Sequence, residues 1–473
     1  MSFVEQIDSG QGVKLTINTS LLFQEKLFSS GVTMACSFSF PSSLSTTEAT
    51  MRILLLFCLA VWHFLPNAYS LSPGQRPVKR VAVVGAGISG LSVAHCLTNS
   101  PSLKEKYGCS ADFDVSIFDS RPTLDMRAGA GVQLNGGLAV LGWINPDVQK
   151  AVIEAGLPQE KVQSRAKAWN ENDPFDVLFE RNLPETVMKK GGDVAKNLID
   201  KDNNLLWISI MRGALQESLI ETLPEETKND ISFGKQMVGI RSNGDVEGGS
   251  LLEFSDGSVS GPFDLIVGCD GIKSACKEYI DTGTISADPS QREGSSKAIY
   301  SGIRIKYAVR DGKESDEGQK TSGLTQFFGD GAYALDGTYG SGAGKPNSKS
   351  AFLIYLDDDY IGPFRRKDSR KTYEVSENAD WTQDVEVTLE SERKAMKAAL
   401  DEAGINPIDV GPTIDAADRI FSLGVYYHNP LTLFGWSRRA PNTEGAQVVL
   451  VGDAAHGKSS TPIHFCSSKW AEY

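Results

Sequence analysis

Three separated segments of this chain combine an apolar strand with a glycine-containing turn directly after it, and in the second and third segments the turn also contains an aspartate. They are residues 80–90, 264–271 and 448–456. Glycine lets the backbone turn tightly and approach a phosphate, and a carboxylate at a strand end accepts hydrogen bonds from ribose hydroxyls. Each segment therefore carries residues suited to binding part of a nucleotide.

The first segment has the spacing G-x-G-x-x-G at Gly85, Gly87 and Gly90, between an apolar strand and a helix. In this context the first glycine permits the turn, the second admits the pyrophosphate, and the third lets helix and strand pack closely. Asp119 ends the next predicted strand, where it would bind the adenosine ribose. The pattern predicts a dinucleotide site without separating FAD from NAD(P).

The second and third segments favour FAD over NAD(P). Asp270 and Gly271 follow one apolar strand, and Gly452 and Asp453 follow another. An NAD-dependent dehydrogenase has no use for two further turns of this kind so far along the chain. The sequence therefore predicts that all three segments meet around a single FAD.

Taken together, the motifs between about residues 78 and 456 resemble the FAD-dependent aromatic hydroxylases, the single-component flavoprotein monooxygenases of the salicylate hydroxylase and zeaxanthin epoxidase kind. The resemblance implies that Asp270 and Gly271 serve both FAD and NAD(P)H, and that Asp453 binds the ribityl chain. It also places Arg212 beside the cofactor and Arg127 in a loop over the isoalloxazine ring. It identifies no catalytic residue.

The fold implied by the resemblance is α/β, with a three-layer, Rossmann-like FAD-binding domain and an inserted, mostly antiparallel β-sheet substrate domain. We assign residues 79–298 to the FAD-binding domain, with excursions toward the substrate domain. Residues 299–440 form the predicted substrate domain, and residues 441–473 return to the FAD-binding domain.

Hydrophobic periodicity and capping residues predict the individual elements. Helices are expected over residues 89–97, from 145 onward, over 212–223 and over 390–403. Strands are expected over residues 79–84, 114–119, 231–240, 251–254, 264–268, 298–305, 351–355, 420–426 and 447–451.

The reaction implied by the resemblance uses NAD(P)H and O₂ to hydroxylate or epoxidise an aromatic or polyene small molecule. Two departures from the family pattern qualify it: Lys277 stands where arginine is usual, and no Gly-Gln-Gly helix start follows His456. We therefore also expect a chain truncated after Asp453, so that a catalytically inactive remnant with weak nucleotide binding is one alternative. A flavin-dependent reductase is another alternative. A halogenase is disfavoured, because the W-x-W-x-I-P signature expected of one is absent from the sequence.

Composition excludes several classes of protein. The chain has 473 residues, a net charge of −13 and an ordinary balance of hydrophobic and charged residues, at 40% and 23%. Because no basic surplus is available to neutralise phosphates, we expect no nucleic-acid partner. Its seven cysteines form no C-x-x-C pair, so neither a metal site nor a disulfide framework is expected.

Residues 1–78 are predicted to be a presequence and linker. Residues 51–70 have a basic start at Arg52, an apolar centre and a small-residue end, which is the pattern of a secretory signal peptide. The apolar run is too short for a stable membrane span. We expect Met51 to be the true start. The basic stretch that follows favours delivery to a plastid through a two-part presequence.

Overall fold

The computed structural model describes the chain in separate stretches. They are residues 2–6, 14–18, 79–99, 113–125, 127, 129–166, 176–192, 195, 198–200, 204–243, 248–286, 297–313, 320–329, 331–356, 385–405, 407–428, 435–440 and 445–455. The chain divides into two compact units, Met1–Gly74 and Gln75–Tyr473. In the first, β1 (Ser2–Gln6) pairs with β2 (Lys14–Asn18). The signal peptide predicted at 51–70 lies outside the described residues and stays a prediction.

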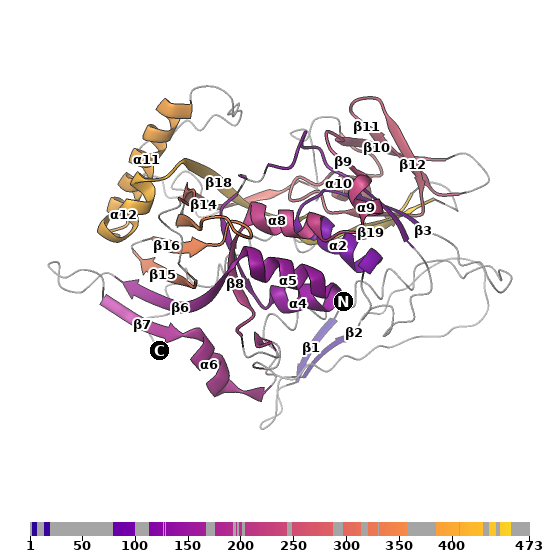
Figure 1. Ribbon diagram of the computed structural model, residues 1–473. Helices are drawn as coiled ribbons and strands as arrows, with labels where there is room; N and C mark the ends of the chain where they lie inside the picture. The colour runs from indigo at the N-terminus through magenta and orange to yellow at the C-terminus, as the bar shows by residue number, and fades with distance from the viewer. Residues whose placement is uncertain are drawn as a thin grey trace. The chain divides into compact units, whose positions relative to one another are not determined.

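A six-stranded sheet carries the three turns at residues 85–90, 268–271 and 452–453, here called the glycine turns (Figure 1). Its strands, in spatial order, are β19 (Ser437–Arg439), β20 (Gln447–Leu450), β13 (Leu265–Gly268), β3 (Lys79–Val84), β4 (Phe113–Phe118) and β9 (Ile231–Ser232). All neighbours are parallel except β19 and β20. The central strands are short, apolar and buried, as expected when both faces of a parallel sheet are covered.

Alternate residues of β3 face two different layers. Ala82 and Val84 join a hydrophobic cluster with residues of the antiparallel strands and the helix on one side. These elements are β10 (Met237–Ser242), β11 (Ser250–Phe254), β12 (Val259–Phe263) and α10 (Ala275–Thr282). Val83 faces α2 (Ile88–Asn99), which packs in turn on α8 (Arg212–Glu221). This three-layer, Rossmann-like arrangement confirms the predicted fold of the nucleotide-binding part.

A second, nine-stranded sheet is mostly antiparallel, as predicted for the substrate domain. It contains β18 (Arg419–Tyr427), β14 (Ile299–Arg310), β17 (Ser348–Leu356), β16 (Ala332–Tyr339), β15 (Ser322–Phe328), β6 (Leu157–Ala166), β8 (Trp207–Met211) and β5 (Gly131–Asn135), with β7 (Asp176–Asn182) paired to β6. Helices α11 (Val385–Glu402) and α12 (Pro407–Asp415) pack on one face of β14, β16, β17 and β18 (Figure 1).

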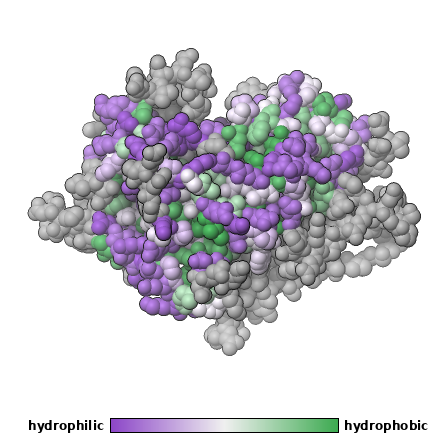
Figure 2. Space-filling model, viewed as in Figure 1, coloured by the Kyte–Doolittle hydropathy of each residue, from purple (hydrophilic) through white to green (hydrophobic). Residues whose placement is uncertain are grey.

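The remaining helices lie between or after strands of the two sheets along the sequence. They are α4 (Gly137–Ile144), α5 (Pro146–Ala155), α6 (Leu183–Lys190), α9 (Glu225–Asn229) and the 3₁₀ turn η4 (Gly452–Ala454). Figure 2 shows apolar side chains gathered over α4 and α5, whose exposed residues include Trp143 and Ile153. No helix among the described residues is long and apolar enough to span a membrane.

The predicted elements compare well with those observed, within a few residues at their ends. Asn145 caps α5, accepting a hydrogen bond from the Asp147 backbone N–H at 2.9 Å. The strand predicted over 231–240 is instead two strands, because Gly234 adopts φ +71° and breaks the run. Residues 75–473 form one compact unit, and β5 to β8 join the sheet of the later strands. The domain boundaries at 298 and 440 therefore stay predictions.

We predict that Gly85→Ala destabilises the fold by about 1–3 kcal/mol, because the position combines unfavourable backbone strain with a steric clash. Gly85 has φ +108°, and an added Cβ would lie 2.4 Å from the Cys269 carbonyl oxygen. Gly257→Ala is the matched control, since Gly257 has φ +81° but no atom within 4 Å of the added Cβ. Urea unfolding of both variants measures the difference; equal losses would contradict a close contact between the first two turns.

Candidate nucleotide-binding site

The three glycine turns lie at the carboxyl edge of the six-stranded sheet, on adjacent parallel strands. Val84 is in register with Gly268, and Gly268 with Leu450. The Cys269 N–H donates to the Val84 carbonyl at 2.7 Å, and the Val451 N–H donates to the Gly268 carbonyl at 2.9 Å. Turns that are 180 and more residues apart in the chain therefore start side by side.

Close packing of glycines brings these turns into contact. Gly85 lies against Cys269 and Asp270, and an added Cβ at Gly452 would lie 2.3 Å from the Ser89 hydroxyl. Gly90 packs so tightly that its Cβ would lie 1.9 Å from the Gly85 carbonyl oxygen. Glycine is required at each of these positions because no larger residue fits without moving backbone or Ser89.

Gly87 differs from the other glycines of the first turn because an added Cβ there would have no atom within 4 Å. It immediately precedes α2, whose first turn carries no acidic side chain. The first backbone N–H groups of a helix have no partners within the helix and attract anions. Gly87 therefore opens space at an anion-attracting helix start, which fits a pyrophosphate.

Asp119 lies at the end of β4 and is bound to the first turn. One carboxylate oxygen accepts a hydrogen bond from the Ala86 N–H at 2.8 Å, and both oxygens accept from the Arg121 guanidinium, at 2.8 and 2.9 Å. Burial alone would raise the pKa of Asp119, but these hydrogen bonds and the charge of Arg121 outweigh it and lower the pKa. The carboxylate is therefore ionised and held rigidly beside the turn. Its predicted contact with a ribose stays a prediction.

Asp270 is bound mainly to its own helix. Its carboxylate accepts from the Ser274 hydroxyl at 2.5 Å and from the N–H groups of Ala275 and Cys276 at 2.7 and 3.1 Å. Burial raises the pKa of Asp270 despite these hydrogen bonds. The side chain thus fixes the start of α10, which leaves the backbone at Gly271, with φ +78° and open space around its Cα, to face a ligand.

Arg212 begins α8 and lies near Asp119 and Asp453, the acidic residues that follow β4 and β20. Within the described part of the chain its guanidinium has no hydrogen-bond partner, although the backbone N–H donates to the Ala130 carbonyl at 3.1 Å. Burial and then the charge of Arg121 lower the pKa of Arg212, while Tyr307, Asp453 and Asp119 act in the opposite direction. A partly buried cation without a protein partner suits an anionic ligand.

The Arg127 side chain, which the sequence predicts over a flavin ring, points to solvent. It is 68% exposed and contacts Asp311 at the end of β14 at 3.3 Å. The loop itself does reach the site, since an added Cβ at Gly129 would lie 2.9 Å from Arg212 Cδ. The backbone of this loop, rather than the Arg127 side chain, is what the structure places beside Arg212.

Tyr307 of β14 is a candidate functional residue that the sequence did not single out. Its ring stacks on Phe421 with centroids 4.9 Å apart and lies 5.9 Å from the Phe352 ring. Burial raises the pKa of Tyr307 to about 12, with Arg212 and Arg419 opposing the rise. The phenol is therefore protonated near neutral pH and can donate a hydrogen bond. Its place on the same strand face as Ile303 and Ile305 is the sequence signal that could have identified it.

Lys277 is fully buried within the fold. Its side chain is buried and lies 3.3 Å from the Asp281 carboxylate, one turn along α10. His428, at the end of β18, is buried beside this pair, and burial followed by the charge of Lys277 lowers its pKa to about 4. The lysine that replaces the usual arginine therefore belongs to a buried polar cluster of Lys277, Asp281 and His428.

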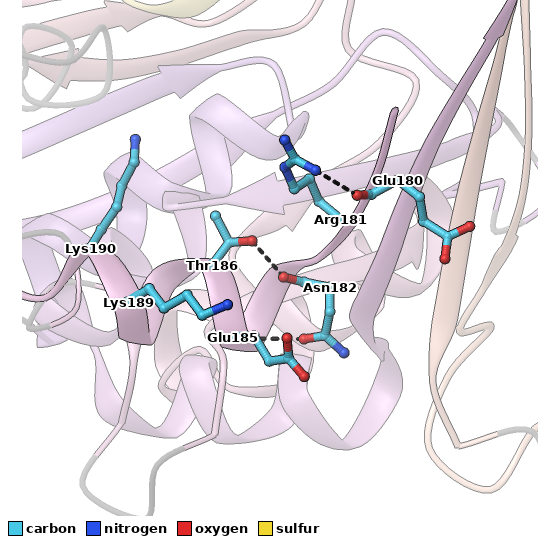
Figure 3. A pocket seen from close by; sticks show the side chains of 7 residues that line it. All are labelled: Glu180, Arg181, Asn182, Glu185, Thr186, Lys189 and Lys190. Atoms are coloured by element: carbon cyan, nitrogen blue, oxygen red, sulfur yellow. Dashed lines mark hydrogen bonds between the residues drawn. The ribbon is translucent and has the colours of Figure 1, made fainter. Parts of the chain in front are cut away.

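A separate surface hollow lies where β7 runs into α6 (Figure 3). Its lining is polar and consists of Glu180, Arg181, Asn182, Glu185, Thr186, Lys189 and Lys190. Asn182 is engaged as the helix cap, accepting from the Glu185 N–H at 3.0 Å and from the Thr186 hydroxyl at 2.6 Å. None of the three glycine turns contributes to this hollow. Asn182, Glu185 and Thr186 are engaged in capping α6, and Glu180 forms an ion pair with Lys161 at 2.7 Å.

Comparison with known proteins gives relatives but no matching family model. The chain is 25% identical over 269 residues to a salicylate hydroxylase of Pseudomonas putida, covering 56% of this chain and 51% of that protein. It is 28% identical over 210 residues to the FAD-dependent monooxygenase ausM of Emericella nidulans, covering 44% and 35%. The chain thus spans about half of the first of these curated relatives and about a third of the second.

Solved structures share the fold at lower identity. A protein from Photorhabdus luminescens assigned as an FAD-containing monooxygenase superposes with a TM-score of 0.50 at 18% identity, covering 81% of this chain and 83% of that one. CtdE, solved with FAD and a substrate, superposes with a TM-score of 0.50 at 16% identity, covering 80% and 75%. Each match covers about four fifths of this chain, which supports the predicted architecture.

We predict that His428 makes stability depend on pH between about 6.5 and 4. Because its pKa falls from the ordinary 6.5 to about 4 in the folded state, the unfolded chain takes up the proton first as pH falls. The stabilisation from a neutral His428 is complete above about pH 6.5 and is lost progressively toward pH 4. In His428→Leu the free energy of unfolding, measured with urea, should vary less with pH across this range. An unchanged slope in the variant would show that the imidazole stays solvated.

Proposed function

We propose that this chain belongs to the FAD-dependent aromatic hydroxylase family, and that it binds one FAD and uses NAD(P)H and O₂ to oxygenate an aromatic or polyene small molecule. The observation that carries the proposal is the convergence of the turns at Gly85, Asp270 and Gly452 on one sheet edge. The names of the curated relatives, salicylate hydroxylase and FAD-dependent monooxygenase, support the same activity.

The residues present fit the adenosine half of FAD. Gly87 leaves open space at the start of α2, where backbone N–H groups would bind the pyrophosphate. Asp119 is ionised, and hydrogen bonds from Ala86 and Arg121 fix its carboxylate. Its oxygens would therefore accept hydrogen bonds from the ribose hydroxyls without a change in side-chain conformation. A rigid, charged acceptor of this kind favours binding because little conformational freedom is lost.

The flavin half would lie between the third turn and the second sheet. Asp453 is exposed at the end of β20 and would bind the ribityl hydroxyls. Arg212 lies near both Asp453 and Tyr307, so its unpartnered guanidinium would face negative charge on the cofactor or the substrate. The backbone of Gly271 would approach the cofactor from the second turn, where a side chain would occupy the open space.

When bound, FAD would supply the chemistry by which one oxygen atom of O₂ enters the substrate and the other leaves as water, with NAD(P)H as the reductant. The chain's own groups would position the substrate. The protonated Tyr307 hydroxyl would donate a hydrogen bond to a substrate oxygen, and the Arg212 guanidinium would stabilise negative charge on it. The aromatic rings of Phe352 and Phe421 would keep water from the reacting ring.

The proposal predicts that the purified full chain takes up FAD and, with NAD(P)H and ¹⁸O₂, transfers one labelled oxygen atom to a member of a panel of phenols, aromatic acids and polyenes. Arg212→Met should weaken FAD or substrate binding about tenfold, as expected for a lost charged contact in a partly buried site. Arg127→Met is the matched control, because that arginine is exposed and paired with Asp311, and should change binding far less.

Three outcomes separate the proposal from its alternatives. Labelled product supports the monooxygenase. NAD(P)H oxidation with FAD bound, but with hydrogen peroxide and no labelled product across the panel, supports a reductase. A chain that folds cooperatively but binds FAD only weakly, with no NAD(P)H oxidation, supports an inactive remnant. Each of the last two contradicts the proposed activity.

A further inference from the structure

The nine-stranded sheet has one face covered by α11 and α12 and a second face, here called the inner face. Because successive side chains of a strand point to opposite faces of a sheet, each residue can be assigned to one of the two faces. Ala308, Ala351 and Leu353 pack with the two helices, and Lys306 bonds to Glu392 of α11 at 2.5 Å. Their chain neighbours therefore point to the inner face. Tyr339 lies on this face, where its ring contacts the position of Gly131 in β5.

From the row of Tyr307 outward, three strands supply nine inner-face residues, and eight of them have hydrocarbon side chains. They are Ile303, Ile305 and Tyr307 of β14, Phe352, Ile354 and Leu356 of β17, and Phe421, Leu423 and Val425 of β18. The row on the other side of Tyr307 contains Val309, Ser350 and Arg419.

The strand register arranges these residues in rows. Tyr307 is opposite Phe352 on one side and Phe421 on the other, and Ile305 is opposite Ile354 and Leu423. The third row contains Ile303 opposite Leu356. With a rise of about 3.4 Å per residue and strands about 4.8 Å apart, the rows cover roughly 13 Å by 10 Å.

The inner face changes character along its length. At one end the Tyr307 side chain is 7% exposed, and its hydroxyl is the only polar side-chain atom of the nine residues. The charge of Arg212 acts on the Tyr307 hydroxyl at this end and opposes the rise in its pKa. Within the described residues, neither the Tyr307 hydroxyl nor the Arg212 guanidinium has a hydrogen-bond partner. At the other end Leu423 and Leu356 are 47% and 52% exposed. The face thus has a polar, buried end and an apolar, exposed end.

We propose that the substrate of this chain is an elongated lipophilic ring compound with one carboxylate or phenolate group at its end. The inference rests on the proposed function. The oxyanion lies at Tyr307 and Arg212, and the apolar body extends over Ile305 to Leu423 and Leu356. A single-ring acid such as salicylate covers only the first row and leaves both exposed leucines in water.

The size of the face argues for a small molecule rather than a protein partner. Roughly 13 Å by 10 Å is about 130 Å², whereas a stable protein interface buries about 800 Å² on each partner. The exposed leucines are also continuous, through Ile305, with the buried polar end where the reacting group would lie. An apolar surface that leads into a site with a few polar groups is the usual form of a small-molecule pocket.

The test compares two acids that differ in length, anthracene-2-carboxylate and salicylate, on the FAD-loaded full chain. Binding of the first is measured by the anisotropy of its own fluorescence, and binding of salicylate by its competition with it. We expect the three-ring acid to bind at least tenfold more tightly than salicylate. Leu423→Ser should weaken the three-ring acid roughly tenfold, since a leucine side chain is lost from its apolar contact, and leave salicylate unchanged.

Two further variants make the test specific. Leu178→Ser, on β7, removes a leucine that is 59% exposed and lies on the sheet's edge strand, so it should leave both affinities unchanged. Leu423→Met keeps an apolar side chain and should retain the wild-type preference. Thermal unfolding of each variant confirms that it is folded before binding is measured.

The possible results distinguish this inference from the function on which it rests. If the chain binds FAD but favours salicylate, or if Leu423→Ser acts no differently from Leu178→Ser, the elongated substrate is ruled out and the flavoprotein function stands. If no FAD is bound, both fail together. Selective loss of the three-ring acid in Leu423→Ser supports the inference.

Discussion

The parallel pairing of β3 with β13 and of β13 with β20 is the constraint on which the rest of the structure depends. Pairing aligns Val84, Gly268 and Leu450 at one edge, so three turns that are far apart in the chain emerge together. The glycines then allow direct contact between the turns, with Gly85 against Cys269 and Gly452 against Ser89. A larger residue at either glycine would separate the turns and divide the site.

Contacts between strands of the second sheet hold the start of α8, and with it Arg212, in place. Tyr339 lies on Gly131, the Met211 N–H donates to the Gly340 carbonyl at 2.8 Å, and Arg212 follows directly at the start of α8. Arg212 therefore lies where the two sheets come together, between the acidic strand ends and Tyr307. This position gives one cation access to both a cofactor and a substrate, which explains why it has no partner within the described residues.

The sequence predicted what local chemistry determines and missed what tertiary pairing determines. Gly85, Gly87, Gly90 and Asp119 were recognisable because turn geometry and strand ends have fixed residue requirements. Arg127 was predicted over the flavin ring, but its side chain lies against Asp311, a partner 184 residues away that no local pattern indicates. Tyr307 was missed because its importance comes from the register that places it between two phenylalanines.

Hydrogen–deuterium exchange of the full chain, with and without FAD, tests most directly whether three turns form one site. The account predicts that FAD slows exchange together at residues 85–91, 269–277 and 451–455, because one ligand contacts all three turns. Exchange in β7 and α6, which line the separate polar hollow, should not change. Protection at residues 85–91 alone, with the other two turns unaffected by saturating FAD, would contradict the account.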